Sequence, residues 1–355
     1  MKNNIKANFW KNKKVFVTGH TGFKGSWLSM WLNELGANVT GYSLKPKTNP
    51  SLFESCQIDK KLDSCIGDVR NYENLKDKII SIQPDIVFHM AAQALVLDSY
   101  QSPVETYHTN LMGTVNILNA IRDVPSIKAF INITSDKCYQ NNINLKAFRE
   151  TDPLGGSDPY SSSKACSELI TAAYRTSFFK DNIGIATARA GNVIGGGDWA
   201  LNRIIPDFIK KIEKDQTLLI RNPDATRPWQ FVLEPLNGYL ILAEKLFLNS
   251  KEYSESWNFG PDNNQNKSVK WLVSKFDKEY GKTNDFEIKV NENQNQEAKY
   301  LELDCSKSIK RLNWKPKLNI EKCISMTCAW YKNFYSNDKD MYEFSVEQIK
   351  QFELV

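Results

Sequence analysis

Short apolar segments alternate with segments of helical apolar spacing through the first half of the chain. The apolar segments, each rich in Val, Ile, Phe or Ala, predict strands at residues 13–18, 37–42, 85–90, 129–134 and 183–188. Helical spacing follows the first of them at residues 26–32 and recurs at residues 104–122 and 160–179. Alternating strands and helices form a parallel sheet, because each crossover helix carries the chain back to the same edge. The pattern therefore predicts an α/β fold with a doubly wound parallel sheet.

Beyond residue 197 the apolar segments become shorter and less regular. They predict helices at residues 203–213, 269–280 and 320–334 and strands at residues 217–221 and 300–303. The polar run at residues 291–296 is expected to be a loop, and the polar segment after residue 336 is expected to dock loosely. We therefore expect a second, smaller lobe of mixed α/β structure.

A glycine-rich turn lies between the first predicted strand and its helix. Gly19, Gly22 and Gly25 are spaced three residues apart there. Glycines permit positive φ and let backbone N–H groups approach a pyrophosphate, whose charge the helix N-terminus favours. The same spacing occurs in ordinary loops, but the flanking strand and helix favour a dinucleotide-binding turn and a Rossmann-type sheet. His20, inside the turn, is either a phosphate contact or an ordinary polar loop residue.

Tyr160 and Lys164 stand one helical turn apart, so their side chains can share one face of the predicted helix. A phenol with a pKa of about 10 acts as a base at neutral pH only where a neighbouring cation favours the phenolate. The plain alternative is an aromatic residue and a solvated charge on an amphipathic helix. The glycine turn upstream favours an acid/base pair that serves hydride transfer.

Candidate ligand-binding residues also follow three other predicted strands. Ala91 and Ala92 come after the strand at 85–90, and Asn192 comes after the strand at 183–188. Residues 135–137, Ser-Asp-Lys, come after the strand at 129–134. Ligands of doubly wound sheets bind at the carboxyl ends of the strands, so these residues are expected to meet around one site.

Composition excludes several classes of protein. The 355 residues, 41% hydrophobic, suit a globular protein of two domains or lobes. No apolar run approaches the roughly 18–20 residues that span a bilayer, and residues 1–6 lack a signal-peptide hydrophobic region, so we expect a cytoplasmic protein without a membrane span. The seven cysteines contain no Cys-x-x-Cys, which predicts reduced thiols rather than disulfides or a zinc clip.

Charge and histidine content further limit the kinds of ligand and partner that we expect. The net charge of +5 is carried by scattered lysines, which argues against nucleic-acid binding and suits an anionic small substrate. The three histidines are too dispersed to predict a metal site.

Longer segments resemble a known family. They are residues 15–27, 134–139, 152–160, 190–199, 220–223 and 225–230. With them the chain resembles the extended branch of the short-chain dehydrogenase/reductase family from residue 9 to about 335, and within it the CDP-glucose group of sugar-nucleotide 4,6-dehydratases. The resemblance implies a homodimer, a role in deoxysugar biosynthesis for lipopolysaccharide or capsule, and NAD as cofactor.

The resemblance also implies a reaction. Hydride passes from sugar C4 to NAD, water is lost across C5 and C6, and the hydride returns to C6. Tyr160 takes the 4-hydroxyl proton, Lys164 lowers the pKa of Tyr160 and binds the nicotinamide ribose, and Ser135 hydrogen-bonds the reacting oxygen. Protonated Asp136 donates to the leaving 6-hydroxyl. Lys137 stands where related dehydratases have a glutamate base, and is either a base of lowered pKa or an electrostatic stabiliser of the enolate.

Binding residues follow from the same resemblance. At the cofactor they are Gly19, Gly22 and Gly25 for the pyrophosphate, His20 and Phe23 in the same turn, Asp68 and Val69 for the adenine edge, and Ala91, Ala92, Tyr160 and Lys164 on the nicotinamide side. At the nucleotide diphosphate they are Asn192, Arg203 and Arg227, since a guanidinium fork suits phosphate oxygens. No acidic residue ends the second strand, where Ser43 and Lys45 would also suit the 2′-phosphate of NADP, so the choice of NAD rests on the resemblance.

The expected domains follow the resemblance as well. Residues 1–190 with 228–258 form the NAD-binding domain, residues 191–227 with 259–335 form the nucleotide-sugar-binding lobe, and residues 336–355 form a C-terminal tail. The helices at 104–122 and 165–179 carry apolar stripes that would form a two-fold interface.

Two segments depart from the CDP-glucose pattern. Leu97 and Asp98 replace two arginines, and residues 294–298 differ from the usual Gln-Pro-His-Glu-Ala. A 4,6-dehydratase for another nucleotide and a 4-epimerase therefore stay open, although an epimerase has no use for Asp136 and Lys137 as an elimination pair. A non-catalytic dinucleotide-binding module would need only the glycine turn.

Overall fold

A parallel sheet forms the centre of the computed structural model, which describes residues 5–140, 147–179, 183–220, 222–262, 266–281, 286–288 and 301–355. Within these residues the sheet has seven strands in the order β11-β6-β5-β4-β1-β2-β3. The strands are β1 (Lys14–Thr18), β2 (Asn38–Ser43), β3 (Asp63–Ile66), β4 (Ile86–His89), β5 (Ala129–Ile133), β6 (Gly184–Ala190) and β11 (Ser256–Phe259). All neighbours pair in parallel, which confirms the predicted doubly wound fold.

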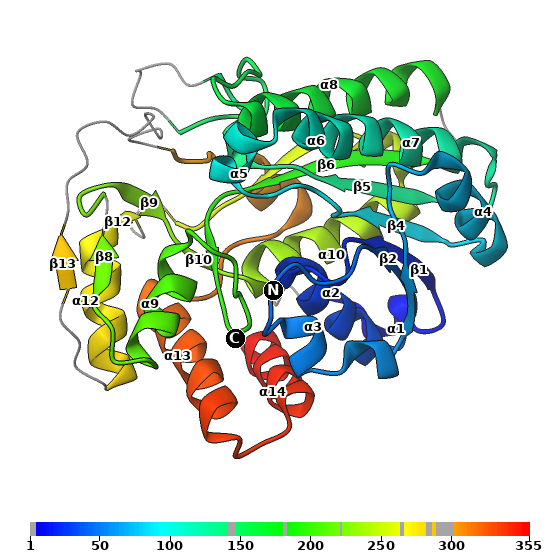
Figure 1. Ribbon diagram of the computed structural model, residues 1–355. Helices are drawn as coiled ribbons and strands as arrows, with labels where there is room; N and C mark the ends of the chain where they lie inside the picture. The colour runs from blue at the N-terminus through cyan, green and yellow to red at the C-terminus, as the bar shows by residue number, and fades with distance from the viewer. Residues whose placement is uncertain are drawn as a thin grey trace.

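Helices cover both faces of this sheet (Figure 1). One face carries α4 (Tyr72–Ile82), α5 (Val96–Gln101), α6 (Pro103–Tyr107), α7 (Gly113–Ala120) and α8 (Pro159–Phe178). The other carries α2 (Phe23–Glu34) and α10 (Leu233–Leu248), with the short helices α1 (Ala7–Trp10), α3 (Leu52–Ser55) and α11 (Ser250–Tyr253) near the sheet. Successive side chains of a strand point to opposite faces, so Val15 and Val17 enter one hydrophobic core and Phe16 enters the other.

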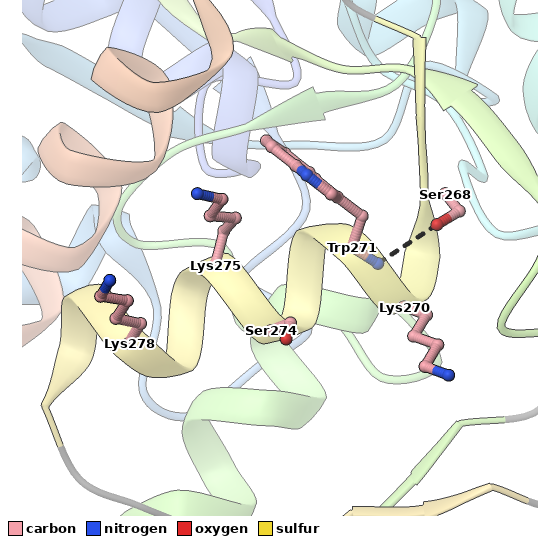
Figure 2. A pocket seen from close by; sticks show the side chains of 6 residues that line it. All are labelled: Ser268, Lys270, Trp271, Ser274, Lys275 and Lys278. Atoms are coloured by element: carbon pink, nitrogen blue, oxygen red, sulfur yellow. Dashed lines mark hydrogen bonds between the residues drawn. The ribbon is translucent and has the colours of Figure 1, made fainter.

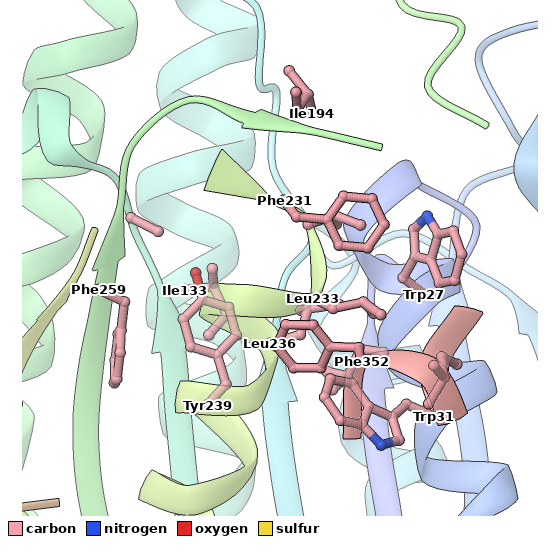
Figure 3. Close-up of a cluster of buried hydrophobic side chains, with 14 of the residues drawn as sticks. Trp27, Trp31, Ile133, Ile194, Phe231, Leu233, Leu236, Tyr239, Phe259 and Phe352 are labelled. Atoms are coloured by element: carbon pink, nitrogen blue, oxygen red, sulfur yellow. The ribbon is translucent and has the colours of Figure 1, made fainter. Parts of the chain in front are cut away.

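The larger core joins elements that are far apart in the sequence. Figure 3 shows Trp27 and Trp31 of α2, Leu236 of α10 and Phe352 near the C-terminus in one cluster. All four side chains are fully buried. This packing fixes α2, the helix that follows the glycine turn, against one face of the sheet.

Smaller strand pairs and helices build the second lobe and its junction with the sheet. Its strand pairs are β7 (Val193–Ile194) with β10 (Gln230–Phe231), β9 (Thr226–Pro228) with β12 (Asn266–Ser268), and β8 (Leu218–Ile220) with β13 (Phe286–Ile288). Its helices are α9 (Ile204–Ile212), α12 (Val269–Tyr280) and α13 (Ile320–Ser336). The helix expected at 269–280 has those bounds. The loop expected at 291–296 and the changed segment 294–298 lie outside the described residues.

Two predicted elements differ from the structure. The helix expected at 104–122 contains a π-helical turn at His108–Met112 between α6 and α7, and ends in a 3₁₀ turn at Ile121–Asp123. The strand expected at 300–303 is wrong for its described part, where Leu303 makes only an isolated bridge with Phe148. One residue pair does not provide the repeated hydrogen bonds that define a strand.

The expectation of a loosely docked C-terminal tail is also wrong. Residues 341–354 form α14 (Met341–Leu354), which Asp340 caps through the Glu343 N–H. Ile349 and Phe352 are buried, and the Trp31 indole donates to Glu353 at 2.7 Å. Apolar residues at helical spacing among polar ones were enough to seat this helix on α2 and α13.

Other expectations concern membrane spans, metal ligands and cysteines. Within the described residues, no helix is both long enough and apolar enough to cross a membrane. The same part of the chain contains no cluster of His, Cys, Asp and Glu side chains that could hold a metal ion. All seven cysteines are described and free, and all but Cys65 and Cys166 are buried, in agreement with the prediction of reduced thiols.

Candidate active site

The glycine turn between β1 and α2 is packed too closely for side chains. Gly19 has φ +79°, and a Cβ on it would lie 2.7 Å from the backbone nitrogen of Ala91. A Cβ on Gly25 would lie 2.1 Å from the Gly19 carbonyl oxygen. Gly22 is the N-cap of α2, and no described side chain caps the first N–H groups of that helix. Uncapped N–H groups beside an open backbone turn fit the pyrophosphate of a dinucleotide.

The side chains of His20 and Phe23, also in this turn, contact residues outside it. The His20 ring is fully buried, its Nε2 lies 2.7 Å from the Ser64 hydroxyl, and burial lowers its pKa to about 4. The ring therefore packs in the core, where burial disfavours its charged form, and a contact of His20 with the cofactor stays a prediction. The Phe23 ring faces Gly195, where a Cβ would lie 3.2 Å from its tip. Phe23 therefore joins the turn to the chain after β7.

At the predicted adenine end of the cofactor site, the Asp68 side chain forms an ion pair with Arg70. Arg70 donates to both of its carboxylate oxygens, with Nη2 at 2.6 Å from Oδ2. Burial opposes ionisation of Asp68, but these bonds outweigh it and lower its pKa. Val69 is buried against Gly113 of α7. Ser43 lies 2.9 Å from the Thr21 hydroxyl.

The catalytic turn predicted after β5 is the 3₁₀ turn η4 (Asp136–Cys138) with its N-cap, Ser135. The Ser135 hydroxyl donates to Asp136 Oδ1 at 3.0 Å and accepts from the Lys137 N–H at 3.2 Å. Asp136 is buried, and its Oδ2 has no hydrogen-bond partner among the described residues. Burial raises the pKa of Asp136 against the opposing effects of Lys137, Ser135 and Arg227. A buried carboxyl group of raised pKa is suited to hold and donate a proton.

Tyr160 and Lys164 lie near the N-terminus of α8, which Asp158 caps and Pro159 begins. Both are buried, and Lys164 Nζ donates to the Ile133 carbonyl at 3.0 Å. Burial raises the pKa of Tyr160 to about 12, while a hydrogen bond with Ser135 and the charge of Arg203 act in the opposite direction. Burial lowers the pKa of Lys164 to about 8. The expected lowering of the Tyr160 pKa is therefore absent from this structure, because desolvation of the phenolate outweighs the nearby cations.

Lys24 is a site residue that the sequence interpretation missed. Its ammonium donates to the Tyr239 hydroxyl at 2.9 Å. Burial, the charges of Lys164 and Arg203 and the opposing charge of Asp136 together lower its pKa to about 7. The available signal was a lysine inside a glycine turn, which was assigned to the cofactor through its glycines alone.

The predicted substrate residues approach the same centre from the second lobe. Arg203 precedes α9, donates to Asp198 at 2.9 Å and acts on Tyr160 through its charge. Arg227, on β9, is buried, and its charge acts on Asp136. Asn192 is half-buried between β6 and β7, next to Gly191, where a Cβ would lie 2.8 Å from Asp136 Oδ2. The structure thus brings the proton-transfer residues and the basic residues to one edge of the sheet.

A shallow hollow on the second lobe contains none of these residues. It runs along α12, as Figure 2 shows, and is lined by Ser268, Lys270, Trp271, Ser274, Lys275 and Lys278. The Ser268 hydroxyl caps the helix by accepting from the Trp271 N–H at 3.2 Å. Exposed lysines along a capped surface helix are ordinary solvated residues, so we place the site at the strand ends.

Comparison with solved structures defines the class of fold. The UDP-glucose 4-epimerase of Thermotoga maritima superposes with a TM-score of 0.79 at 20% identity, over 91% of this chain and 99% of that one. A dTDP-glucose 4,6-dehydratase from Bacillus anthracis, solved in complex with NAD, gives 0.75 at 22% identity over 90% and 97%. The fold is that of the Rossmann-type epimerases and dehydratases of the short-chain dehydrogenase/reductase family.

Sequence comparison is more specific. The family model for GDP-mannose 4,6 dehydratase matches residues 16–327. The CDP-glucose 4,6-dehydratase of Salmonella typhimurium is 48% identical over 98% of each chain. The UDP-glucose 4-epimerase of Mycoplasma pneumoniae is 25% identical over 91% of this chain and 98% of its own. The chain belongs to the GDP-mannose 4,6 dehydratase family.

Proposed function

We propose that the protein is an NAD-dependent nucleotide-sugar 4,6-dehydratase that converts CDP-glucose to CDP-4-keto-6-deoxyglucose. The observation that carries the chemistry is the buried Asp136 carboxyl group, with an oxygen that no described residue engages, beside Ser135 and Tyr160. An enzyme that only oxidises and reduces C4 does not need this acid. The 48% identity to a CDP-glucose 4,6-dehydratase over 98% of the chain supports the choice of substrate.

Oxidation at C4 uses the residues of α8 and the catalytic turn. Tyr160 accepts the 4-hydroxyl proton, and the Ser135 hydroxyl holds the reacting oxygen. The ligand-free pKa of about 12 must fall for Tyr160 to act as a base, and Ser135 and Arg203 already act in that direction. NAD supplies the hydride acceptor at C4 and the hydride donor at C6. Lys164 is proposed to hold the nicotinamide ribose.

Water loss uses the next two residues of the turn. Asp136 gives its proton to the 6-hydroxyl as the C6–O bond breaks, and the C5 proton is removed at Lys137. Burial of Asp136 favours its protonated form, which this step requires. Lys137 is half-buried and serves as the base or as the cation that stabilises the enolate. C5 takes back a proton when hydride reaches C6, so the sequence is redox-neutral.

Binding is assigned to the glycine turn and to the second lobe. Gly19, Gly22 and Gly25 are proposed for the pyrophosphate through their backbone. The remaining proposed cofactor residues are Phe23, Asp68, Val69, Ala91 and Ala92, together with the backbone of His20. Asn192, Arg203 and Arg227 are proposed for the nucleotide diphosphate. The domain boundaries at 190/191, 227/228, 258/259 and 335/336 follow this division between cofactor and substrate.

A panel of nucleotide sugars tests the proposal. The protein is incubated with NAD and, separately, CDP-, GDP-, UDP- and dTDP-glucose, and each product is analysed for a 4-keto-6-deoxy sugar. We expect the product from CDP-glucose. The same product from another nucleotide sugar, but not from CDP-glucose, would place the chain among the other dehydratases. A C4 epimer without water loss would make it a 4-epimerase.

A homodimer is proposed from the exposed apolar side chains of the helices on one sheet face. Val104 is 80% exposed and Leu169 is 57% exposed, and Tyr107, Met112 and Phe178 are exposed as well. Light scattering should give twice the chain mass of 40.7 kDa. Val104→Glu with Leu169→Glu should restore the single-chain mass, while Leu354→Glu, at an exposed position of α14, should not. We also propose a cytoplasmic role in making deoxysugars for lipopolysaccharide or capsule, which rests on the family resemblance.

A further inference from the structure

A buried ion pair joins α8 to β6 beneath the catalytic turn. The Glu168 carboxylate accepts from Arg189 through both oxygens, with Nη2 to Oε2 at 2.8 Å and Nε to Oε1 at 2.9 Å. The two side chains are only 1% and 2% exposed. Burying two charges costs free energy that their attraction only partly returns, so a pair this deep suggests a role beyond stability.

Further hydroxyl groups complete the bonding of Glu168. Thr187, on β6, donates to Oε2 at 2.7 Å, and Ser256, on β11, donates to the same oxygen at 3.2 Å. Thr134 donates to Oε1. The carboxylate is thus a fixed acceptor that connects three adjacent strands, β11, β6 and the end of β5.

The Glu168–Arg189 ion pair contacts residues at both ends of the catalytic turn. Thr134, bonded to Glu168, directly precedes Ser135. Tyr139 directly follows Cys138, and its hydroxyl accepts from Arg189 Nη1 at 2.7 Å. The Arg189 guanidinium also lies 4.8 Å from the centre of the Tyr139 ring. A single buried unit therefore holds the residues on either side of Ser135, Asp136 and Lys137.

The same unit is tied to the acid/base helix. Glu168 follows Lys164 by one helical turn and Tyr160 by two, so the three side chains lie along one face of α8. Any displacement of α8 relative to the turn must move this carboxylate away from Thr134 or Arg189. The bonds of Glu168 to Thr134 and Arg189 consequently set the distance between Tyr160 and the Ser135–Lys137 segment.

We propose that Glu168 and Arg189 are positioning residues that hold the catalytic turn in register with Tyr160 and Lys164. The kinetic consequence of this inference rests on the proposed dehydratase function. Its structural consequence rests on the hydrogen bonds alone. The competing explanation is a core ion pair that supports the fold without a directed effect on the turn.

Substitutions at two threonines distinguish these two explanations. Thr134→Val and Thr187→Val each remove one hydroxyl bond to Glu168, conserve side-chain shape and leave the ion pair intact. Both residues are buried, at 7% and 0% exposure. Only Thr134 is attached to the catalytic turn. Tyr139→Phe provides a second test from the other end, because it removes the hydroxyl that Arg189 contacts.

Turnover of CDP-glucose and hydrogen exchange of the ligand-free protein are measured for each variant. We expect Thr134→Val and Tyr139→Phe to lower kcat about tenfold to a hundredfold with KM within about twofold, as misplacement of catalytic groups does. Thr187→Val should keep kcat within about twofold. Faster exchange of the Lys137 amide, which donates to Ser135, should accompany only the first two variants.

Equal kcat and equal exchange of the Lys137 amide in the two threonine variants would overturn the inference. Failure of the proposed function is seen separately, because the unaltered protein would then form no 4-keto-6-deoxy sugar from CDP-glucose. The comparison of amide exchange still decides the positioning role in that case. Unfolding midpoints of the two threonine variants should fall by similar amounts, which shows that stability alone does not explain a kinetic difference.

Discussion

The Ser135 hydroxyl donates to one carboxylate oxygen of Asp136 at 3.0 Å, while the other oxygen of Asp136 stays buried without a partner in the described structure. A buried carboxyl group without a compensating charge at bonding distance favours the protonated form. This places a proton donor directly beside the hydroxyl that is proposed to hold the reacting oxygen. The arrangement lets one short turn serve both oxidation and water loss.

Asp136→Asn should separate these two steps. The amide keeps the shape of the side chain but cannot supply the proton that the leaving 6-hydroxyl needs. Turnover should fall by about 10²- to 10⁴-fold, as for other lost acids, while C4 oxidation continues. Rapid mixing with substrate should show reduced cofactor and a 4-keto-hexose on the enzyme. If hydride transfer itself is lost, the role assigned to Asp136 is wrong.

Tyr160→Phe should stop the reaction one step earlier. The substitution removes the acceptor of the 4-hydroxyl proton from a site where the rest of the ring stays buried. We expect no reduced cofactor in the first turnover and a loss of about 10²- to 10⁴-fold in kcat. Accumulation of reduced nicotinamide at the wild-type rate would contradict the assignment. Tyr253→Phe, at a tyrosine on α11, serves as the matched control.

Lys24→Met should stabilise the ligand-free protein in a pH-dependent way. Burial and neighbouring cations lower the pKa of Lys24 from 10.5 to about 7, so the folded state disfavours its charged form. The cost is fully present below pH 7 and disappears as the pH rises toward 10.5, because the unfolded chain holds its proton up to that value. The gain in unfolding midpoint should therefore be larger at about pH 6 than at about pH 9. Lys45→Met, at an exposed position, should show no such trend.

Phe352→Ala should show that the C-terminal helix is part of the core. Phe352 is fully buried, and its ring meets Trp31 edge-on with centroids 5.7 Å apart. Truncation of a buried Phe costs about 3–5 kcal/mol in the free energy of unfolding. Urea titration measures this loss. Leu354→Ala, two residues away at 80% exposure, should change it by less than about 0.5 kcal/mol. Equal effects would mean that the helix docks loosely after all.

Features with a strong local signal could be predicted from the sequence. Apolar strands alternating with helices indicated the parallel sheet, and Val269–Tyr280 was expected with its observed bounds. The glycine turn was located because Gly19 and Gly25 stand in a close backbone contact that excludes side chains. Tyr160 and Lys164 were paired because helical geometry alone sets their spacing.

The rest depends on tertiary packing that a linear pattern does not contain. The packing of the His20 ring against Ser64 and Phe53 could not be predicted, because both residues are distant from it in sequence. Lys24 gained its lowered pKa from Asp136, Lys164 and Arg203, which are distant in sequence. The pKa of Tyr160 is raised in the ligand-free protein because burial of the phenol, which the sequence does not show, outweighs the hydrogen bond with Ser135 and the charge of Arg203.

Intramolecular hydride return is the central claim, and CDP-glucose carrying deuterium at C4 tests it most directly. The reaction should run with catalytic amounts of NAD and leave no net reduced cofactor. A mixture of unlabelled substrate with substrate that carries both the C4 deuterium and a ¹³C-labelled glucose shows whether the deuterium stays within one molecule. The account predicts CDP-4-keto-6-deoxyglucose with the deuterium at C6 of the same molecule. Stoichiometric reduced cofactor, or deuterium retained at C4 of a hexose that has not lost water or of its epimer, would contradict it.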